Sequence, residues 1–270
     1  MHRGYEIIWL ESTDSTNDQA RSQLKSTDFL TVIAAENQTS GKGQRGNSWH
    51  SEPGKNLTFS IIVRPAETNP WITVKASDQA AISHMAALSV IDLMNLYGIP
   101  AKIKWPNDIY VSDRKICGIL IENAIMGMHV SSSIIGIGLN VNQTNFPPYL
   151  PNPTSMQRET GIHTDTHLLL EKYMEIFLEY CRTYLTEQEK LTSLKYNYNE
   201  HLWRLDEPHE FYDYTSLPCG HLNAQETLSR SEAEQFTGII RGVSDEGRLI
   251  VENVEGELRE FAFKEIGYKI

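Results

Sequence analysis

The stretch GKGQRGNSWHSEPG, residues 41–54, decides between two classes of fold. Its first six residues, Gly41–Gly46, match the pattern G-x-G-x-x-G and follow an apolar run at Leu30–Glu36 that predicts a strand. A dinucleotide-binding fold also needs a helix directly after the last glycine, because the helix N-terminus receives the pyrophosphate. Residues 47–54 have no helical periodicity and end in the turn-forming pair Pro53-Gly54. The stretch therefore argues against a dinucleotide-binding fold and predicts a long loop.

The loop also fails the test for a phosphate-binding P-loop, because Asn47 stands where that motif requires lysine. What remains is a flexible backbone segment that carries two cations, Lys42 and Arg45. Glycines let main-chain N–H groups approach an anion closely, and the two cations can neutralise its charge. Taken alone, the segment fits either an anion-binding loop or an ordinary surface loop.

The hydrophobic pattern on both sides of the loop predicts an α+β fold. Short apolar or β-branched runs predict strands at Tyr5–Leu10, Leu30–Glu36, Leu57–Val63, Ala101–Trp105, Ile109–Val111, Lys115–Asn123 and Val130–Asn140. Helical stretches are predicted at Asn17–Leu24, Val74–Tyr97 and His167–Tyr198. We expect a mixed, mostly antiparallel sheet with helices packed against it.

The pattern changes after Arg204. Three short runs, Phe236–Val243, Arg248–Glu252 and Leu258–Phe263, are separated by turns that contain glycine. Such spacing is typical of a small all-β unit such as a barrel. We therefore predict two domains, residues 1–204 and residues 205–270.

Charge and composition exclude several classes of protein. The chain has 270 residues and a formal net charge of -11, with no basic stripe of the kind that binds DNA phosphates. No stretch approaches the roughly 20 apolar residues of a membrane span, and the N-terminus lacks the apolar run of a signal peptide. The three cysteines are far apart, which favours free thiols over disulfides or a metal site. We expect a cytoplasmic protein without DNA or membrane partners.

A second segment of chemical interest combines KWPND, residues 104–108, with RKICGIL, residues 114–120. Pro-Asn-Asp after an apolar strand is by itself only a turn. Lys115, however, enters an apolar strand, where a long cation is not normally placed. Either Lys115 lies at a sheet edge and reaches water, or it points into a cleft to meet an anion.

A third segment, IIGIGLN at residues 134–140, places two glycines in an apolar strand. Gly136 and Gly138 leave one face of that strand without side chains, which often marks close approach by a ligand or another backbone. A β-bulge is the alternative explanation.

Together these segments resemble the biotin protein ligase family. The matching residues occur in the family's order over roughly residues 5–142, with weaker similarity in the C-terminal β unit. They are Asp14–Asn17, Glu36–Ser40, Gly41–Gly46, Trp49, Lys104–Asp108, Arg114-Lys115, Gly118–Leu120 and Gly136–Asn140. KWPND followed by RK-x-x-GIL is the specific part of this pattern.

The resemblance implies a catalytic domain like that of class II synthetases and a C-terminal SH3-like barrel. It also implies an ATP-dependent ligase that uses biotin and Mg²⁺-bound ATP as substrates. The carboxylate of biotin would attack the α-phosphate of ATP to give biotinyl-AMP, and a lysine of a biotin carboxyl carrier domain would then displace AMP. Mg²⁺ would travel with ATP, so we expect no metal site built by the protein itself.

The resemblance also assigns roles to individual residues. Catalysis would fall to Lys115, placed between carboxylate and phosphate, together with Arg45 and Asp108. Biotin would be bound by Ser15, Thr16, Asn17, Gln38, Gly41, Lys42, Gly43, Gly118, Gly136 and Gly138. ATP or AMP would be bound by Arg45, Trp49, Asn107, Lys115 and Asn140, with Trp49 covering adenine and Asn140 reading it.

The chain departs from the family in the glycine-rich loop. The family commonly has arginine where this chain has Lys42 and Gln44, and often another arginine near Asn47. Lysine keeps the charge but loses the bidentate fork of arginine, whereas glutamine loses the charge. We therefore expect Lys42 and Arg45 to hold the adenylate.

Two other functions fit a related pattern. A lipoyl or octanoyl ligase or transferase shares the fold and the acyl-to-lysine chemistry, but KWPND and the C-terminal β unit favour biotin. A non-enzymatic regulatory module that binds biotinyl-AMP is the alternative of another class, and Lys115 argues against it. Bifunctional relatives carry a DNA-binding segment ahead of the catalytic domain, and because the matching residues here begin near Ser15, we expect no such segment. An exposed sheet edge could pair two copies into a homodimer.

Overall fold

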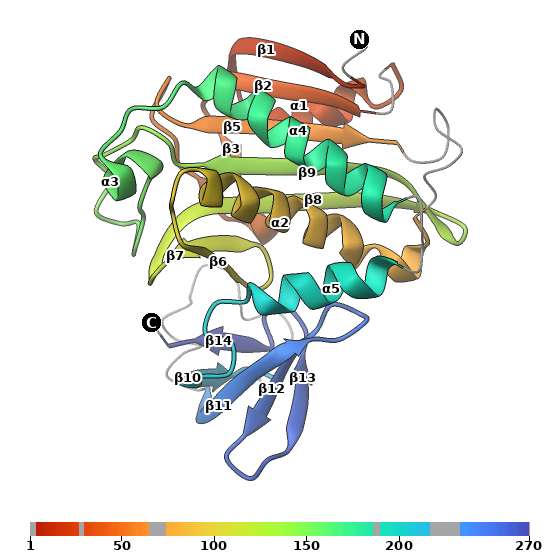
Figure 1. Ribbon diagram of the computed structural model, residues 1–270, viewed down its shortest axis with the longest axis vertical. Helices are drawn as coiled ribbons and strands as arrows, with labels where there is room; N and C mark the ends of the chain where they lie inside the picture. The colour runs from red at the N-terminus through yellow and green to blue at the C-terminus, as the bar shows by residue number, and fades with distance from the viewer. Residues whose placement is uncertain (1–3, 27–29, 65–73, 186–189, 217–232, 270) are drawn as a thin grey trace.

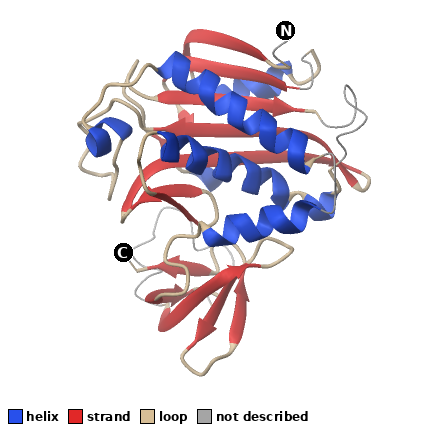
Figure 2. Ribbon diagram, in the orientation of Figure 1, coloured by secondary structure: helices blue, strands red, loops and turns tan. Residues whose placement is uncertain are grey.

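The computed structural model describes residues 4–26, 30–64, 74–185, 190–216 and 233–269, except for the side chain of Arg45. Within these ranges the chain forms a large sheet covered by helices and a smaller sheet near the C-terminus (Figure 1, Figure 2). The large sheet has seven strands in the order β1-β2-β5-β9-β8-β7-β6. Their bounds are Glu6–Thr13 (β1), Leu30–Gln38 (β2), Leu57–Val63 (β5), His129–Leu139 (β9), Arg114–Met126 (β8), Asp108–Val111 (β7) and Ala101–Lys104 (β6).

Neighbouring strands of the large sheet are antiparallel, with one exception. β1 and β2 are parallel, and α1 (Thr16–Gln23) lies in the crossover that joins them. The other pairs run in opposite directions, from β2 with β5 through to β6 with β7. The structure thus confirms the predicted mixed, mostly antiparallel sheet.

Helices cover both faces of the large sheet. α2 (Ala80–Leu96) and α4 (Thr166–Tyr184) lie over one face, and α1 packs on the other (Figure 1). In β2, Val32 belongs to the main core and Ile33 to the smaller core beside α1, and neither side chain is exposed. Because successive side chains of a strand point to opposite faces, a continuously apolar strand needs a layer on each side.

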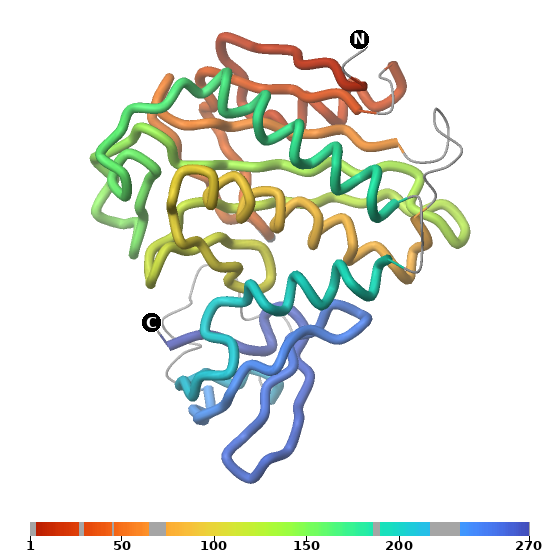
Figure 3. The backbone as a smooth tube through the Cα atoms, viewed as in Figure 1, coloured from red at the N-terminus to blue at the C-terminus, as the bar shows by residue number. Residues whose placement is uncertain are grey.

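The smaller sheet has five antiparallel strands in the order β13-β12-β11-β10-β14. Their bounds are Leu258–Phe261 (β13), Leu249–Asn253 (β12), Glu234–Val243 (β11), Pro208–Asp213 (β10) and Ile266–Tyr268 (β14). Figure 3 shows the chain passing along α5 (Leu191–Glu200), which lies between the two sheets, and then into the blue C-terminal strands. The all-β nature of this unit is confirmed, and the division after residue 204 stays a prediction.

The segment that leads into the smaller sheet also closes one edge of the large sheet. The N–H of Ile103 in β6 donates to the carbonyl of His201 at 2.8 Å, and the N–H of Trp203 donates back to Ile103 at 2.8 Å. The indole N–H of Trp105 donates to the carbonyl of Gly247 at 3.0 Å, which joins the KWPND turn to the smaller sheet. The outer edge of β6 is therefore already occupied by the chain's own backbone.

The glycine-rich segment is more ordered than a plain loop. β3 (Gly41–Lys42) pairs with β4 (Ser48–Trp49) in a short hairpin that encloses the 3₁₀ turn η1 (Gln44–Gly46). As predicted, no α-helix follows Gly46, because β4 and an extended segment come next. The structure thus lacks the helix after Gly46 that a dinucleotide site would need.

Two helix predictions need correction at their ends. The helix predicted from Val74 begins at Ala80, after a separate 3₁₀ turn η2 (Ala76–Asp78). The region predicted as helical from His167 to Tyr198 contains two helices, because α4 ends at Tyr184 and α5 begins at Leu191. A further short helix, α3 (Met156–Thr160), was not predicted; Ser155 caps it and Gly161 ends it with φ 75°.

No helix in the described ranges is long and apolar enough to cross a membrane. Cys117 and Cys181 are buried free thiols, and burial raises the pKa of both. Cys219 lies outside the described residues.

Candidate active site

A cavity of about 340 Å³ lies between the two sheets. Its walls come from the glycine-rich hairpin, the KWPND turn, glycine-containing parts of β8 and β9, and the C-terminal segment 263–268. Residues as far apart in sequence as Ser15 and Tyr268 therefore meet around one space.

Glycines form the floor of this cavity. Gly118 of β8 and Gly138 of β9 lie opposite each other in regular register. A Cβ on Gly138 would lie 2.4 Å from Cε2 of Trp49, and a Cβ on Gly136 would lie 2.1 Å from Oδ1 of Asn17. No real side chain fits at such distances, so close approach, and not a bulge, explains the two glycines of β9.

The indole ring of Trp49 lies on this floor. Besides its contact with Gly138, it would meet a Cβ on Gly118 at 3.1 Å. The indole Nε1 is buried and has no hydrogen-bond partner among the described residues. Lys115 Nζ lies 5.6 Å from the ring centroid, over the ring. The ring is thus held by packing and by a nearby cation, and its polar atom is not satisfied.

A β-bulge turns Lys115 toward the cavity. The pairing of β7 with β8 skips Ile116, which is the extra residue on β8. In a regular strand Lys115 would share a face with the fully buried Cys117. The bulge places it beside Gly118 instead, where its Cε and Nζ lie 3.3 Å from the position of a Cβ. Of the two placements that the sequence left open, the structure shows the one that faces a cleft.

Asp108 fixes the ammonium group of Lys115. The Lys115 Nζ lies 2.7 Å from Oδ1 of Asp108, and the two side chains are 31% and 22% exposed. Such a partly shielded pair is screened less by salt than a pair on the open surface. The result is a fixed cation in the cavity wall, which is the arrangement that stabilises negative charge developing during a reaction.

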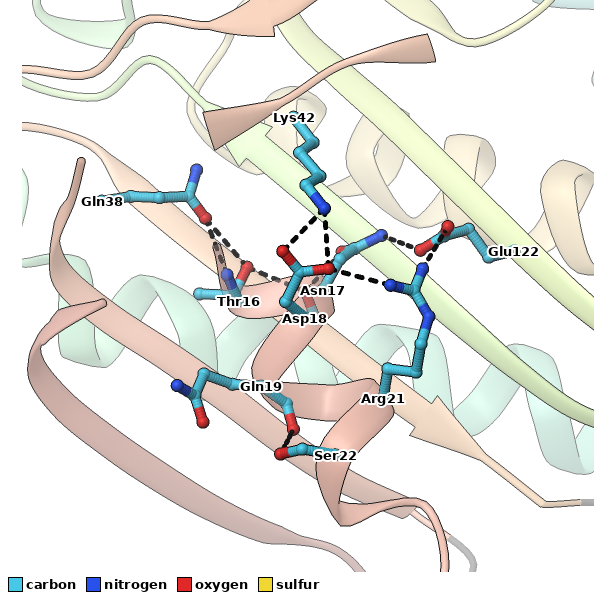
Figure 4. Close-up of polar contacts among 10 residues, drawn as sticks. Thr16, Asn17, Asp18, Gln19, Arg21, Ser22, Gln38, Lys42 and Glu122 are labelled. Atoms are coloured by element: carbon cyan, nitrogen blue, oxygen red, sulfur yellow. Dashed lines mark hydrogen bonds and ion pairs between the residues drawn. The ribbon is translucent and has the colours of Figure 1, made fainter. Parts of the chain in front are cut away.

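Lys42 is also paired, with Asp18 of α1 (Figure 4). The Lys42 Nζ lies 2.7 Å from Oδ2 of Asp18, and a guanidinium nitrogen of Arg21 lies 2.8 Å from Oδ1. Arg21 in turn contacts Glu122 of β8 at 2.5 Å. The neighbouring Lys42 lowers the pKa of Asp18. Alternating charges thus connect the glycine-rich hairpin to α1 and β8.

Hydrogen bonds fix the carboxamides beside this charge network. Gln38 Oε1 accepts from the N–H of Thr16 at 2.9 Å and from its hydroxyl at 3.2 Å (Figure 4). Asn17 Oδ1 accepts from the hydroxyl of Ser60 at 2.6 Å, and its Nδ2 donates to Glu122 at 2.9 Å. Both carboxamides line the cavity, so they can recognise a polar ligand with little loss of freedom.

The structure brings most of the predicted site residues to the cavity. Its lining includes Ser15, Asn17, Gln38, Lys42, Gly43, Trp49, Asn107, Asp108, Lys115, Gly118, Gly136 and Gly138. Thr16 and Gly41 lie behind the lining, where Thr16 holds Gln38 and a Cβ on Gly41 would meet the carbonyl of Trp49 at 2.5 Å. The backbone of Arg45 lies in η1, but its side chain lies outside the described part of the structure.

The structure does not bring Asn140 to the cavity. Asn140 is 4% exposed, it is not part of the lining, and its Nδ2 donates to the carbonyl of Thr154 at 2.9 Å. The predicted contact of this side chain with adenine therefore has no support from the geometry. In the described ranges, no three His, Cys, Asp or Glu side chains lie close enough to hold a metal ion.

The C-terminal sheet supplies a wall that the sequence did not predict. That wall consists of Tyr214, Phe263, Lys264, Ile266, Gly267 and Tyr268. These residues belong to no local motif and reach the cavity only because the two sheets pack together. Six further lining residues could have been predicted from the sequence, because they lie within or beside the motifs quoted above. They are Gln44, Asn47, Ser48, Lys104, Trp105 and Pro106.

Lys104 shows how the smaller sheet supports the KWPND turn. Its Nζ lies 4.7 Å from the ring centroid of Tyr110, 5.9 Å from that of Trp203 and 5.1 Å from that of Tyr268. Aromatic faces attract a cation, so these rings hold the ammonium group. The hydroxyl of Tyr268 is buried with no partner in the described structure, and burial raises its pKa.

Two family models match this chain. Residues 9–140 match the Biotin/lipoate A/B protein ligase family, and residues 225–265 match the Biotin protein ligase C terminal domain. Together the two models cover the large sheet from within β1 to the end of β9, and strands β11, β12 and β13 of the C-terminal sheet.

Individual relatives agree with these matches. The bifunctional ligase/repressor BirA of Bacillus subtilis (strain 168) is 33% identical over 94% of this chain and 71% of its own length. The biotin–acetyl-CoA-carboxylase ligase of Paracoccus denitrificans is 27% identical over 92% of this chain and 94% of its own. Among solved structures, the biotin protein ligase from Aquifex aeolicus in complex with biotin and ATP has a TM-score of 0.73 at 24% identity, covering 98% of both chains. At that identity the structural match shows a shared fold.

Proposed function

The chain belongs to the biotin protein ligase family and is a ligase that attaches biotin to protein, and we propose that it does so through biotinyl-AMP. In the first step, a carboxylate oxygen of biotin forms a bond to the α-phosphorus of ATP, and the bond to pyrophosphate breaks. In the second step, the neutral amine of a lysine on a biotin carboxyl carrier domain attacks the acyl carbon. An amide bond forms, the amine loses a proton, and AMP leaves.

The position of Lys115 is the observation that carries this proposal. The first step brings two anions together, a carboxylate and a phosphate, and charge increases on the phosphate oxygens as the bond to pyrophosphate breaks. A cation fixed in place beforehand stabilises that charge without reorganising during the reaction. Lys115 meets this need because the bulge turns it into the cavity and Asp108 fixes its Nζ at 2.7 Å.

The glycine floor and its fixed carboxamides suit the biotin end of the reaction. The bicyclic ring of biotin can lie against the surface that Asn17 and Trp49 form over Gly136 and Gly138, where neither glycine presents a side chain of its own. Ser15, Asn17 and Gln38 line the same part of the cavity and can exchange hydrogen bonds with a ureido group. Lys42 supplies a cation at the rim for the carboxylate or the adenylate.

The nucleotide would lie between Trp49, the KWPND turn and the C-terminal wall. Trp49 offers an aromatic surface, and Asn107 lines the cavity beside it, held by a bond from its Nδ2 to the carbonyl of Ile119 at 2.5 Å. Lys104 and Lys264 line the cavity near the smaller sheet and add positive charge there. Mg²⁺ would arrive with ATP as part of the substrate.

Replacing Lys115 by alanine tests the proposed first step. We expect Lys115→Ala to lower the single-turnover rate of biotin-dependent pyrophosphate release at least about a hundredfold, as loss of a group that stabilises a transition state commonly does. Thermal unfolding followed by circular dichroism should show that the variant remains folded, because the side chain is a third exposed and lies beside the cavity.

Lys102→Ala is the matched control. Lys102 is a cation on β6, two strands away from Lys115 in the same sheet, but it is exposed and donates to the carbonyl of Glu200. Its removal should leave pyrophosphate release within about twofold of the wild type, since it touches no reacting group. Near-normal release by Lys115→Ala would contradict the assigned role of Lys115.

Lipoate is the second candidate substrate, because the larger family model covers lipoate as well as biotin ligases. The match of residues 225–265 to a biotin protein ligase domain supports biotin. ATP–pyrophosphate exchange measured with biotin and with lipoate separates the two. We expect exchange with biotin and little with lipoate.

A further inference from the structure

The carboxamide of Asn17 lies above Gly136, between two other strands of the large sheet. Its Oδ1 would lie 2.1 Å from a Cβ on Gly136, and Asn17 is 4% exposed. Ser60 of β5 lies opposite Gly136 on one side. On the other side Leu120 of β8 lies opposite Gly136, and Glu122 lies two residues further along β8. Because residues two apart in a strand share a face, Ser60 and Glu122 reach Asn17 from the two strands that flank β9.

Ser60 alone does not decide which way this carboxamide is turned. Its hydroxyl oxygen lies 2.6 Å from Asn17 Oδ1 and 2.8 Å from Thr16 Oγ1. The hydroxyl has one hydrogen, and Thr16 uses its own hydrogen to donate to Gln38 Oε1 at 3.2 Å. Thr16 and Asn17 therefore compete for the single hydrogen of Ser60. If the carboxamide were reversed, Ser60 could accept from Asn17 Nδ2 and donate to Thr16, so Ser60 favours the reversed orientation.

Glu122 opposes that reversal. Its Oε2 accepts from Asn17 Nδ2 at 2.9 Å (Figure 4). A carboxylate has no hydrogen to donate, so a reversed carboxamide would place Oδ1 against it, and the two acceptors would repel each other. The other oxygen of Glu122, Oε1, accepts from the guanidinium of Arg21 at 2.5 Å, which holds the carboxylate in place. The orientation of Asn17 therefore depends on Glu122.

We propose that Glu122 is a positioning residue for biotin: it fixes the orientation of Asn17, and with it the donors and acceptors that this carboxamide offers to the ligand. The inference rests on the proposed function, in which the ureido group of biotin meets Asn17. A ureido group has a carbonyl oxygen that accepts and two N–H groups that donate. A reversed carboxamide would set like groups against each other, so biotin would bind more weakly. Glu122 itself does not line the cavity, so it acts through Asn17.

Glu122→Gln is the direct test, because it keeps the size of the side chain and removes the carboxylate. A glutamine can accept or donate, so it tolerates both orientations of Asn17. We expect the dissociation constant of biotin, measured by calorimetry, to rise about tenfold. The dissociation constant of ATP, and the single-turnover rate of pyrophosphate release at saturating biotin, should stay within about twofold, because the groups proposed to act on the phosphates are unchanged.

A double-mutant cycle with Asn17→Ala shows whether Glu122 acts through Asn17. Asn17→Ala should itself weaken the binding of biotin. In that background Glu122→Gln should change the dissociation constant of biotin by less than about twofold, because no carboxamide is left to orient. A merely structural role of Glu122 would instead give the same factor with and without Asn17.

Glu252→Gln is the matched control. Glu252 of β12 is also paired with an arginine, because its Oε2 accepts from Nε of Arg241 at 2.6 Å. Its side chain is 29% exposed, against 36% for Glu122. The substitution removes the same charge from the smaller sheet, and Glu252 does not line the cavity. Glu252→Gln should leave the dissociation constant of biotin within about twofold of the wild type.

Three results would overturn the inference. The first is wild-type affinity for biotin in Glu122→Gln, and the second is an equal effect of this change in the Asn17→Ala background. The third is a lower single-turnover rate at saturating biotin with unchanged affinity, which would place Glu122 in the chemical step. If Glu122→Gln does not fold, Glu122→Ala takes its place in the cycle and the same results decide. A wild-type protein without biotin-dependent exchange would overturn the proposed function itself, whereas an active wild type with an unaffected variant overturns the inference alone.

Discussion

Lys42 is a predicted ligand-binding cation whose charge is already balanced by Asp18 at 2.7 Å. An anionic ligand that uses Lys42 must compete with that carboxylate. Half of the Lys42 side chain and 40% of Asp18 are exposed, so the ion pair is screened by water and contributes only about 0–1 kcal/mol. Asp18 thus weakens the binding of anions modestly and does not block it.

Asp18→Asn should free Lys42 for a ligand. We expect a non-hydrolysable analogue of biotinyl-AMP to bind about two- to fivefold more tightly, with the gain shrinking as salt rises. Calorimetry at low and high ionic strength measures both effects. Glu11→Gln removes an equal charge from an exposed position on β1 and should leave the affinity unchanged. Weaker binding by Asp18→Asn would mean that the carboxylate orients Lys42 and does not compete for it.

At the scale of elements, the contact between α2 and α5 contains a histidine that should be neutral near pH 7. His84 of α2 is 6% exposed, and its ring lies against that of Tyr198 of α5 with 4.1 Å between centroids and a tilt of 32°. Burial, with a smaller effect of Lys195 on α5, lowers the pKa of His84 to about 4. The unfolded chain therefore takes up a proton near pH 6.5, whereas the folded protein does not until about pH 4.

Stability at this contact should fall as the pH drops from 6.5 toward 4, because the unfolded state then binds more protons. Between pH 7.5 and pH 5 the loss attributable to His84 is on the order of 2 kcal/mol. His84→Phe keeps a ring against Tyr198 and should reduce the pH dependence of the unfolding free energy by that amount, measured by urea denaturation. Replacing the exposed His163 by glutamine should leave the pH dependence of the unfolding free energy unchanged. An unchanged slope in His84→Phe would show that His84 is protonated in the fold.

Elements with a strong local pattern could be predicted from the sequence, and those that depend on tertiary contacts could not. Leu57–Val63 is β5 as predicted, because a short run rich in β-branched and aromatic residues that ends at Arg64-Pro65 is typical of a strand. The bulge at Ile116 has no such pattern, since the backbone there is bonded to distant segments, Ile116 to Asn140 and Lys115 to residues 152 and 154. For the same reason the sequence left Lys115 with two placements, and the role of Asn140 stays a prediction.

At the scale of the whole molecule, the cavity is complete only because the smaller sheet closes it. Tyr268 of β14 lies in its wall, with a buried hydroxyl that has no partner within the described ranges. An unsatisfied buried hydroxyl costs about 1–3 kcal/mol, and we propose that a role of Tyr268 in ligand binding offsets this cost. The sequence could not predict this wall, because its residues are distant from every motif of the large sheet.

Tyr268→Phe should therefore have two opposite effects. Stability without ligand should rise by about 1 kcal/mol in urea denaturation, because the unsatisfied hydroxyl is removed. The KM for ATP should rise several-fold while the KM for biotin stays the same, because we propose that the nucleotide lies against the C-terminal wall. Tyr196→Phe, at an exposed position on α5, should change neither quantity. An unchanged KM for ATP would assign the wall to docking of the carrier protein instead.

The closed edge at β6 has a consequence for how copies of this chain can associate. Ile103 is already bonded to His201 and Trp203, so no further strand can add there. The outer edge of β1 has no paired strand in the described part of the chain. A sheet with one open edge can pair with one partner copy. The open β1 edge of each copy is then covered by the other. Growth through this sheet would stop at a symmetric pair and could not continue into a fibre.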